Sequence, residues 1–453
     1  MFSAQVMTNC EKYLGLPMFG GKSKVNTFKD LQEQITKRVM GWKEKTISKA
    51  GREVLIKTVA QAIPTYSMSI FKLPKKVCDD INSVLAKYWW GQTRNEKKIH
   101  CINWNKLCNP KNKGGMGFRN IHVFNLAMLP KQAWHLVTGA QSLFYRVYKA
   151  RYFPWCSFLE AKLGLNPSFV WRSLCAAREL IIEGSHWQVG NGQSITINNQ
   201  KWLPRPPLFN PGADTSLKVG DLIDKHTMQW DRPRVQDIFM QPTQQDVLNI
   251  RLNDLQTQDK IYWKENKANR FTVQSAYLIA LHLNQGGEVE HSRAHEDKRL
   301  WNKIWRLRVP LKVRNFLWRA SSDVLPTRAN IARRRLPVDP SCAICGQAEE
   351  SVCHALWEYS LATNVWALVK GKLQKSSVVV QDFHSLARQM EDKLTGKEME
   401  VWAMVAWSIW NARNRFCFEK KQSQPGNILH SAMSLLQDYQ RLTQHLAEQN
   451  HPT

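Results

Sequence analysis

Apolar residues recur every three to four positions along much of the chain, the period of an amphipathic helix. Helices are therefore predicted over residues 28–45 and 48–63, and Pro64 is expected to close the second one. The core-facing side of that second helix is predicted from its apolar positions, which are Val54, Leu55, Thr58, Val59, Ala62 and Ile63.

A third helix is predicted between Pro74 and Gly91, because proline is favoured in the first turn of a helix and glycine just beyond its end. Its apolar face is predicted at Val77, Ile81, Val84, Leu85 and Tyr88. A fourth helical run covers residues 123–137, and Pro130 is expected to kink it.

Strand patterns are short and rare in this sequence. Two alternating runs within residues 187–197 flank the turn signal Gly190-Asn191-Gly192, which predicts a small β-hairpin. The Pro-rich stretch 203–212 predicts a linker and a domain boundary. The predicted fold class is mainly α, with this one hairpin.

Composition changes the picture from a generic helical protein to a strongly basic one. The 453 residues are 43% apolar, long enough for several domains with cores of their own. The ten Cys lack the regular spacing of a disulfide framework, no secretory signal opens the chain, and no apolar run approaches the roughly 20 residues of a membrane span. A soluble protein of a reducing, intracellular compartment is expected.

The net charge of +27, with a pI of about 9.8, predicts a polyanionic partner. Residues 1–150 carry 25 Lys and Arg against 8 Asp and Glu, and residues 303–335 carry ten against one. A solvated basic face without a partner is the alternative. The aromatic residues among these cations, such as Trp104, Phe118 and Trp134, are expected to serve the core more than to stack on bases. The cations predicted to contact phosphate are Lys97, Lys98, Lys113, Arg119, Lys131, Lys312, Arg314 and Arg319.

Cys342-Ala-Ile-Cys345, followed by His354, has the spacing of a zinc knuckle. The fourth ligand is not evident, because Cys353 is adjacent to His354 and neighbouring side chains diverge. A Cys-containing turn held by tryptophan packing alone is the alternative. His291 and His295 form a weaker candidate pair in a polar linker.

No catalytic residues are predicted. Asp79 and Asp80 superficially resemble the paired carboxylates that hold two metal ions in a polymerase. That motif requires a β-hairpin, whereas these residues lie within the predicted third helix, so a catalytic role is rejected.

Several segments together resemble one family. In order along the chain they are Tyr13-Leu-Gly-Leu-Pro17, residues 114–121, Trp187-Gln-Val-Gly-Asn-Gly192, Leu300-Trp301, residues 309–319, Leu325-Pro326-Thr327-Arg328, the Cys pair, His354-Ala-Leu-Trp357 and residues 402–416. This order resembles plant LINE-type, non-LTR retrotransposon proteins and their reverse-transcriptase zinc-binding domain, over roughly residues 13–420. In that family a Cys follows the His by five residues, and here Tyr359 stands there. The resemblance therefore implies zinc held by Cys342, Cys345 and His354 with a defective fourth corner.

The resemblance also implies an organisation and a function. Expected are a thumb and connection remnant over residues 1–140, a helical segment with the hairpin over 141–203, a linker and lead-in over 204–297, the zinc-binding domain over 298–370, and a helical region over 371–453. The polymerase palm and the RNase H centre are expected to be missing. The expectation is a non-enzymatic protein that binds nucleic acid, RNA or single-stranded DNA, with a nuclear location favoured. The alternatives are a segment that works with a separate palm, or a degenerate protein-interaction adaptor.

Overall fold

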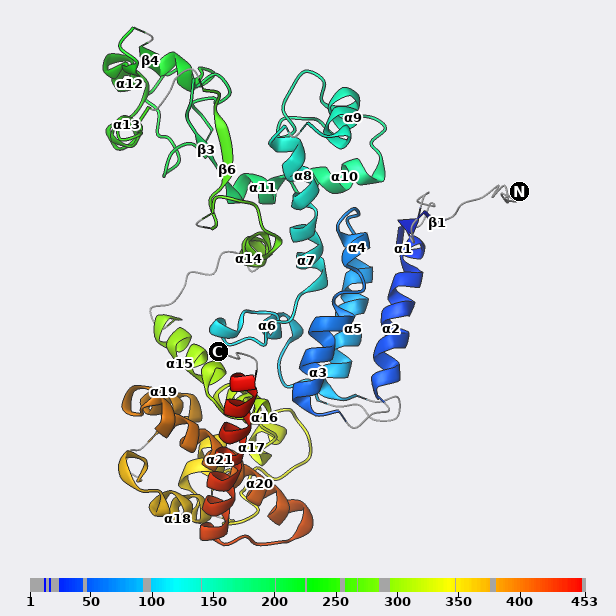
Figure 1. Ribbon diagram of the computed structural model, residues 1–453, viewed down its shortest axis with the longest axis vertical. Helices are drawn as coiled ribbons and strands as arrows, with labels where there is room; N and C mark the ends of the chain where they lie inside the picture. The colour runs from blue at the N-terminus through cyan, green and yellow to red at the C-terminus, as the bar shows by residue number, and fades with distance from the viewer. Residues whose placement is uncertain are drawn as a thin grey trace, which may run out of the picture. The chain divides into compact units, whose positions relative to one another are not determined.

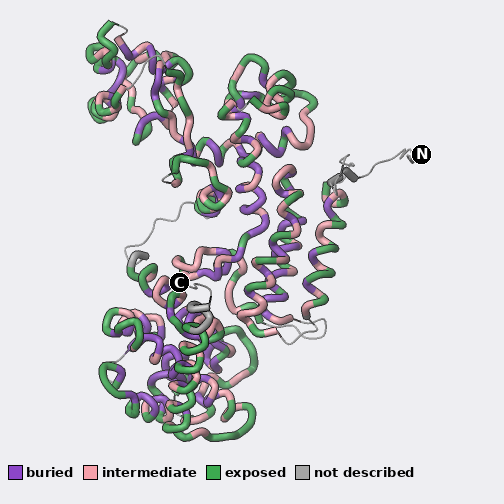
Figure 2. The backbone as a smooth tube through the Cα atoms, in the orientation of Figure 1, coloured by how far each residue is buried: buried purple, intermediate pink, exposed green. Residues whose placement is uncertain are grey.

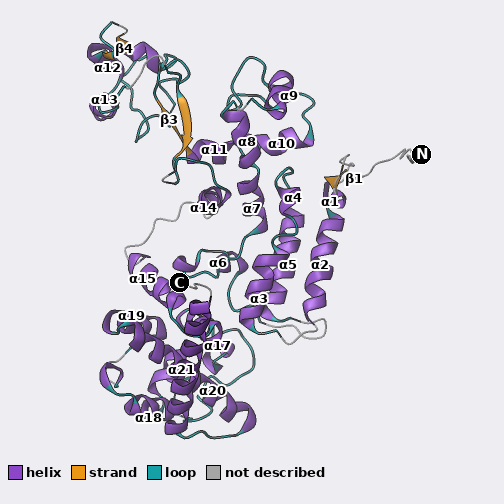
Figure 3. Cartoon of the chain, viewed as in Figure 1, coloured by secondary structure: helices purple, strands orange, loops and turns teal. Residues whose placement is uncertain are grey.

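The computed structural model describes residues 12–13, 16–17, 24–43, 47–92, 99–139, 141–199, 201–224, 226–252, 257–266, 268–284, 294–346, 348–374 and 380–449. Helices dominate these residues (Figure 3), so the predicted mainly α class is confirmed. Two compact units form, each from three stretches of chain. Unit 1 comprises Met1–Ile35, Gln61–Ile81 and Ile121–Glu288, and unit 2 comprises Thr36–Ala60, Asn82–Asn120 and Val289–Thr453.

The predicted N-terminal helices are confirmed. They are α2 (Lys29–Lys43), α3 (Lys49–Leu55), which continues as a π-helical turn η1 (Ile56–Ala60), and α5 (Lys75–Trp90). Ser48 caps α3 by accepting a hydrogen bond from the Gly51 N–H at 3.2 Å. Gly91 follows α5 with a φ of +75°, the left-handed conformation that glycine adopts without strain.

The predicted core face of α3 is wrong. Val54 is 49% exposed, whereas Ile56 and Ala60 are fully buried. Glu53 is buried beside them because the ammonium groups of Lys57 and Lys111 each lie 2.8 Å from its carboxylate. The buried positions Glu53, Ile56 and Ala60 keep a helical spacing but belong to a face that includes a charged residue, which an apolar pattern does not select.

The predicted kink at Pro130 is confirmed as a break between α7 (Ile121–Met128) and α8 (Pro130–Val137). The buried side chain of Asn125 anchors α7 to the turn after α4 (Thr65–Met68). It accepts a hydrogen bond from the Leu73 N–H and donates to the carbonyls of Met68 and Phe71, all at 2.8–2.9 Å. A buried amide with three partners is fully compensated.

The predicted hairpin over residues 187–197 is wrong. Strand β3 (Ser185–Gln188) pairs antiparallel with the distant β6 (Lys260–Trp263) instead. The Gly190–Gly192 segment wraps around the Asp259 carboxylate, which accepts hydrogen bonds from the N–H groups of Gly190, Gly192 and Ser194 at 2.7–2.8 Å. Three N–H groups on one carboxylate satisfy the loop more fully than a two-residue turn would.

The remainder of unit 1 packs around small cores. The Pro-rich stretch 203–212 lies within this unit, and Leu203 and Phe209 pack into a cluster with Trp202 and Phe239. The small antiparallel pair of this region is β4–β5. The elements not yet placed are β1 (Lys12–Tyr13), β2 (Leu16–Pro17), α1 (Lys24–Thr27), α9 (Leu143–Tyr152), α10 (Phe169–Cys175), α11 (Arg178–Gly184), η3 (Val219–Leu222), β4 (Ile223–Asp224), β5 (Gln229–Trp230), α12 (Arg232–Ile238), α13 (Gln241–Leu248) and α14 (Val273–Asn284).

Unit 2 is built around α20 (Gly396–Glu419), which packs on α16 (Leu311–Ser321) and α21 (Pro425–Gln449) (Figure 1). Thr395 and Glu398 form a capping box at the start of α20. The middle of α20 is buried on all sides, whereas α21 is buried along one face (Figure 2). The other elements are α6 (Trp104–Leu107), η2 (Lys111–Lys113), α15 (Ala294–Arg306), α17 (Arg328–Ala332), η4 (His354–Glu358), α18 (Ser360–Leu368), η5 (Gly371–Leu373) and α19 (Phe383–Lys393). Across the described residues, no helix is both long and apolar enough to cross a membrane.

Candidate metal centre

The structure brings Cys342, Cys345 and His354 together in unit 2. The two Sγ atoms and a ring nitrogen of His354 lie within 4.8 Å of one another. Among the described residues these three form the one group of three or more Cys, His, Asp or Glu side chains with such spacing. The candidate ligands from the sequence are therefore confirmed as neighbours.

Local backbone bonds fix the Cys pair. Ser341 bridges to Glu349, and the Cys342 N–H donates to the Ala348 carbonyl at 2.7 Å, which closes a small loop around the two thiols. The Gly346 N–H donates back to the Cys342 carbonyl at 2.9 Å, and Gly346 has a φ of +66°. This tight turn directs both Sγ atoms to one side.

His354 is oriented from both ends of its ring. Its Nε2 lies 3.4 Å from the Cys345 Sγ, and its Nδ1 lies 3.7 Å from a carboxylate oxygen of Glu358. A carboxylate on the far nitrogen is the arrangement that orients metal-binding histidines. Nε2 is thus the nitrogen available to a metal.

The donor set fits zinc at three corners. Two ligands of a tetrahedral zinc stand about 3.6–3.8 Å apart, given Zn–S and Zn–N bonds of about 2.3 and 2.1 Å. The Cys345–His354 separation of 3.4 Å is already close to that value. Burial raises the pKa of the Cys342 thiol, so a metal would displace its proton on binding.

Tyr359 lies at the position of the missing fourth ligand. Its side chain is buried, its ring centroid is 6.3 Å from that of His354, and its hydroxyl has no hydrogen-bond partner. Burial, followed by the nearby thiols of Cys342 and Cys417, raises its pKa above the usual value, so the hydroxyl stays protonated at neutral pH. A neutral phenol is not among the usual zinc ligands, and the fourth corner therefore does not match a closed structural site.

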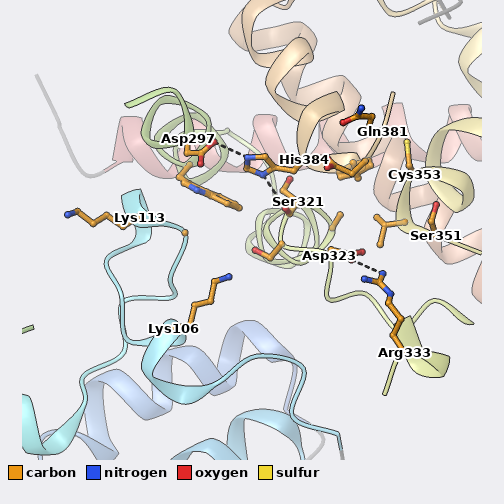
Figure 4. A pocket seen from close by; sticks show the side chains of 17 residues that line it. Lys106, Lys113, Asp297, Ser321, Asp323, Arg333, Ser351, Cys353, Gln381 and His384 are labelled. Carbon is orange, nitrogen blue, oxygen red and sulfur yellow. Dashed lines mark hydrogen bonds and ion pairs between the residues drawn. The ribbon is translucent and has the colours of Figure 1, made fainter. Parts of the chain in front are cut away.

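Cys353 does not replace it. Burial, followed by the Glu358 carboxylate, raises the pKa of this thiol to about 12. Cys353 lines a separate cavity of about 580 Å³ together with Ser321, Asp323 and His384 (Figure 4). The side chains of Cys353 and its neighbour His354 thus point to different places, as expected from the sequence.

Polar side chains that line this cavity pair with one another. The His384 ring nitrogens face the Ser321 carbonyl at 3.2 Å and the Asp297 carboxylate at 2.9 Å, and Arg333 pairs with Asp323 at 2.8 Å. Both ring nitrogens of His384 thus have polar partners within the protein.

A buried ion pair that no sequence pattern predicted supports the centre. The guanidinium of Arg413 on α20 makes two hydrogen bonds to the Glu350 carboxylate, one from Nε at 2.8 Å and a second from Nη2. Glu350 also accepts from the Arg328 N–H at 2.9 Å. This bidentate pair ties the loop before His354 to α20. Two residues 63 positions apart give no pattern from which the pair could be predicted.

The predicted phosphate contacts fall into three groups. Lys97 and Lys98 lie outside the described residues. Lys131 in unit 1 and Lys113, Arg119 and Lys312 in unit 2 have exposed side chains. The ammonium of Lys312 lies 4.6 Å from the centre of the Trp407 ring, a cation–π contact that leaves its charge near solvent.

Arg314 and Arg319 are half-buried instead of forming part of an exposed face. Arg314 donates to the Trp305 carbonyl at 3.1 Å, and the Nε atoms of both residues are buried without a hydrogen-bond partner. These two side chains are partly covered because α3 packs against α16, a tertiary contact that the sequence pattern did not predict. Two of the aromatic residues predicted to serve the core do so: Phe118 is buried, and Trp134 packs on Trp263 and Phe271. Trp318 on α16 is buried as well.

The rejected catalytic motif lies on a helix, as expected. Asp79 is exposed on α5, and Asp80 accepts a hydrogen bond from Gln32 at 3.3 Å. His291 and the side chain of His295 lie outside the described residues.

Comparison with known proteins identifies the family to which the chain belongs. A family described as zinc-binding in reverse transcriptase matches residues 271–366. An Arabidopsis thaliana protein named "Putative ribonuclease H protein" is 26% identical over 414 residues, which cover 88% of this chain and 65% of that relative. This chain thus spans about two thirds of the length of that relative.

A second Arabidopsis thaliana relative, named "Uncharacterized mitochondrial protein", is 37% identical over 152 residues. The match covers 32% of this chain and 99% of the relative. By this near-complete match and by its zinc-binding segment, the chain belongs to the plant proteins related to the reverse transcriptases of LINE-type, non-LTR retrotransposons.

Proposed function

We propose that this chain binds nucleic acid, with RNA or single-stranded DNA preferred, and does not itself catalyse polymerisation or hydrolysis. The observation that carries the proposal is the net charge of +27 together with the exposed cations Lys113, Arg119, Lys131 and Lys312. Phosphodiesters are the abundant intracellular polyanion that such a charge attracts. The expected nuclear location stays a prediction.

We further propose zinc as the metal of the Cys342, Cys345 and His354 centre. The grouping of two thiols with a histidine Nε2 supports this choice, because that set favours zinc among common divalent ions. Bound zinc would supply folding energy by holding the Cys turn against η4. The chain's own contribution is to orient His354 through Glu358 and to exclude water with Tyr359 and Trp357.

The non-catalytic part of the proposal is supported by the helical setting of Asp79 and Asp80. Consecutive residues of a helix point about 100° apart, so these carboxylates do not converge on a shared pair of metal ions. A second candidate is a segment that assists a catalytic polypeptide. The name of the 26% identical relative, which is longer than this chain, favours it.

Salt dependence tests the binding. Fluorescence anisotropy of the full chain with single-stranded RNA, duplex DNA and heparin at several salt concentrations should give steep log–log plots, with a slope of about −0.7 per phosphate contacted on a single strand. The triple variant Lys113→Gln, Arg119→Gln, Lys312→Gln should flatten the slope by about two units if each cation contacts one phosphate. Lys113→Arg with Lys312→Arg is the matched control and should leave the slope unchanged. Affinity that is indifferent to salt would overturn the proposal.

A further inference from the structure

Three cationic side chains from two helices of unit 2 lie close together, near the aromatic rings of Tyr88, Trp89 and Trp90. Lys49 and Arg52 lie on α3, and Arg319 lies on α16, which packs against it. The Lys49 ammonium donates to the Trp89 carbonyl at 2.9 Å and lies 5.0 and 4.8 Å from the centres of the Trp89 and Trp90 rings. These contacts fix the ammonium but do not neutralise it.

No carboxylate among the described residues pairs with Lys49, Arg52 or Arg319. Glu53, the neighbour of Arg52 in sequence, is occupied by Lys57 and Lys111 at 2.8 Å each. The Arg52 guanidinium lies 5.8 Å from the centre of the Tyr88 ring, and the Nε of Arg319 is buried without a partner. The fold thus desolvates like charges together, which costs free energy unless an anion completes the cluster.

Among the residues that the structure describes, the charged neighbours of Lys49 are positive. Burial, then Arg319 and Arg52, lowers the pKa of Lys49 to about 7, and among the described residues the Cys101 thiol opposes this shift. Lys87 on α5 and the exposed His100 also face the cluster, and burial followed by these lysines lowers the pKa of His100. Arg334 donates to the carbonyls of His100 and Cys101.

We propose that Lys49, Arg52 and Arg319 form a binding site for one phosphodiester of a single-stranded nucleic acid, with the adjoining base placed on the His100 ring. This inference rests on the proposed nucleic-acid binding and gives it a location. The exposed His100 ring lies 6.1 Å from the Trp90 ring at 24°, a nearly parallel stack that a base can extend. Guanidinium and ammonium groups without a carboxylate partner match the charge of a phosphodiester.

The site makes binding dependent on pH in a defined direction. A bound phosphate favours the charged ammonium and so raises the pKa of Lys49 in the complex. At a pH above the free-state pKa of about 7, binding is therefore accompanied by uptake of a proton. Affinity must therefore fall as pH rises. For one linked proton with a free pKa of about 7, the fall between pH 7.5 and 8.5 is about eightfold. Histidines of ordinary pKa are already neutral in that window.

The test measures binding of a short oligouridylate to the full chain. Fluorescence anisotropy gives the affinity at pH 7.5 and 8.5, and calorimetry in two buffers of different ionisation enthalpy gives the number of protons taken up. The unmodified chain should lose about eightfold in affinity over this range and take up nearly one proton on binding. Lys49→Arg should bind at both pH values without proton uptake, because a guanidinium stays charged. Lys49→Met should lose about tenfold at pH 7.5, whereas Lys397→Met, which changes an exposed lysine of α20, should match the unmodified chain.

The outcomes separate the two proposals. Binding that is independent of pH and unaffected by Lys49→Met would overturn this site and leave nucleic-acid binding in place. An unmodified chain that does not bind the oligonucleotide would overturn both. Inorganic tripolyphosphate that binds as tightly as the oligonucleotide, with no loss on His100→Ala, would overturn the assignment of a nucleic-acid backbone.

Discussion

At the residue scale, the defining feature of this chain is a tyrosine in place of a metal ligand. Cys342, Cys345 and His354 converge as their spacing predicts, yet the hydroxyl of Tyr359 is buried without a partner. A buried hydroxyl that makes no hydrogen bond costs about 1–3 kcal/mol. Tyr359 therefore fills the fourth corner sterically while contributing no charge to it.

Tyr359→Cys should create a complete Cys₃His site. Zinc affinity should rise by about 100-fold or more, because a fourth thiolate closes the tetrahedron. In excess zinc the thermal midpoint should rise by about 5 °C, and chelator should abolish the gain. Metal titration followed by differential scanning calorimetry measures both quantities.

Two variants serve as controls for that prediction. Tyr359→Phe removes the hydroxyl without adding a ligand and should leave zinc affinity unchanged. His354→Ala combined with Tyr359→Cys should cancel the gain. An unmodified chain that already holds one equivalent of zinc tightly, with no further gain from the cysteine, would show that another group completes the site.

At the element scale, single polar side chains fix the connections between elements. Asn125 joins α7 to the turn after α4, and the Glu350–Arg413 pair joins the loop between Cys345 and His354 to α20. The Asp259 carboxylate does the same for the loop after β3 by accepting three backbone hydrogen bonds. Each of these side chains satisfies backbone or charged groups that lie 20 or more residues away in sequence.

Asp259→Ala should destabilise unit 1 by about 2–4 kcal/mol, because three loop N–H groups lose a charged acceptor. Hydrogen exchange of the Gly190, Gly192 and Ser194 amides should accelerate, and denaturant unfolding should report the loss of stability. Asp214→Ala is the matched control, since Asp214 is exposed and bonds locally to Ser216. A loop whose amides remain protected in Asp259→Ala would contradict the account.

At the scale of the whole molecule, the chain has a net charge of +27 and a segment that matches a zinc-binding family of reverse transcriptases. Its one Asp-Asp pair of polymerase type, Asp79 and Asp80, lies on the helix α5. We expect the purified chain neither to extend a primer on a template nor to cut an RNA–DNA hybrid, because a two-metal site needs converging carboxylates. Primer-extension and hybrid-cleavage assays with Mg²⁺ or Mn²⁺ check this, with an intact reverse transcriptase as positive control. Template-dependent incorporation that persists in Asp79→Ala would reveal a catalytic centre elsewhere in the chain.

Local sequence patterns predicted most helices and the grouping of the candidate metal ligands. Proline and glycine at helix ends predicted the bounds of α5 and the break at Pro130, because those residues act through the local backbone. The Cys-x-x-Cys turn is equally local, and it brought Cys342 and Cys345 together with His354 as expected.

Tertiary structure alone decided which partners distant segments take. β3 pairs with β6 instead of forming a hairpin, because the intervening loop is held by Asp259 from beyond the local sequence. The buried face of α3 and η1 includes Glu53, Ile56 and Ala60, because Lys57 and Lys111 pair with the Glu53 carboxylate. The packing of α3 on α16 buries Arg319 and brings it near Lys49. Only the fold determines that these two cations are neighbours and that no carboxylate of the described residues pairs with them. Helical period and charge counts are properties of neighbouring residues, whereas these arrangements depend on contacts that no local pattern encodes.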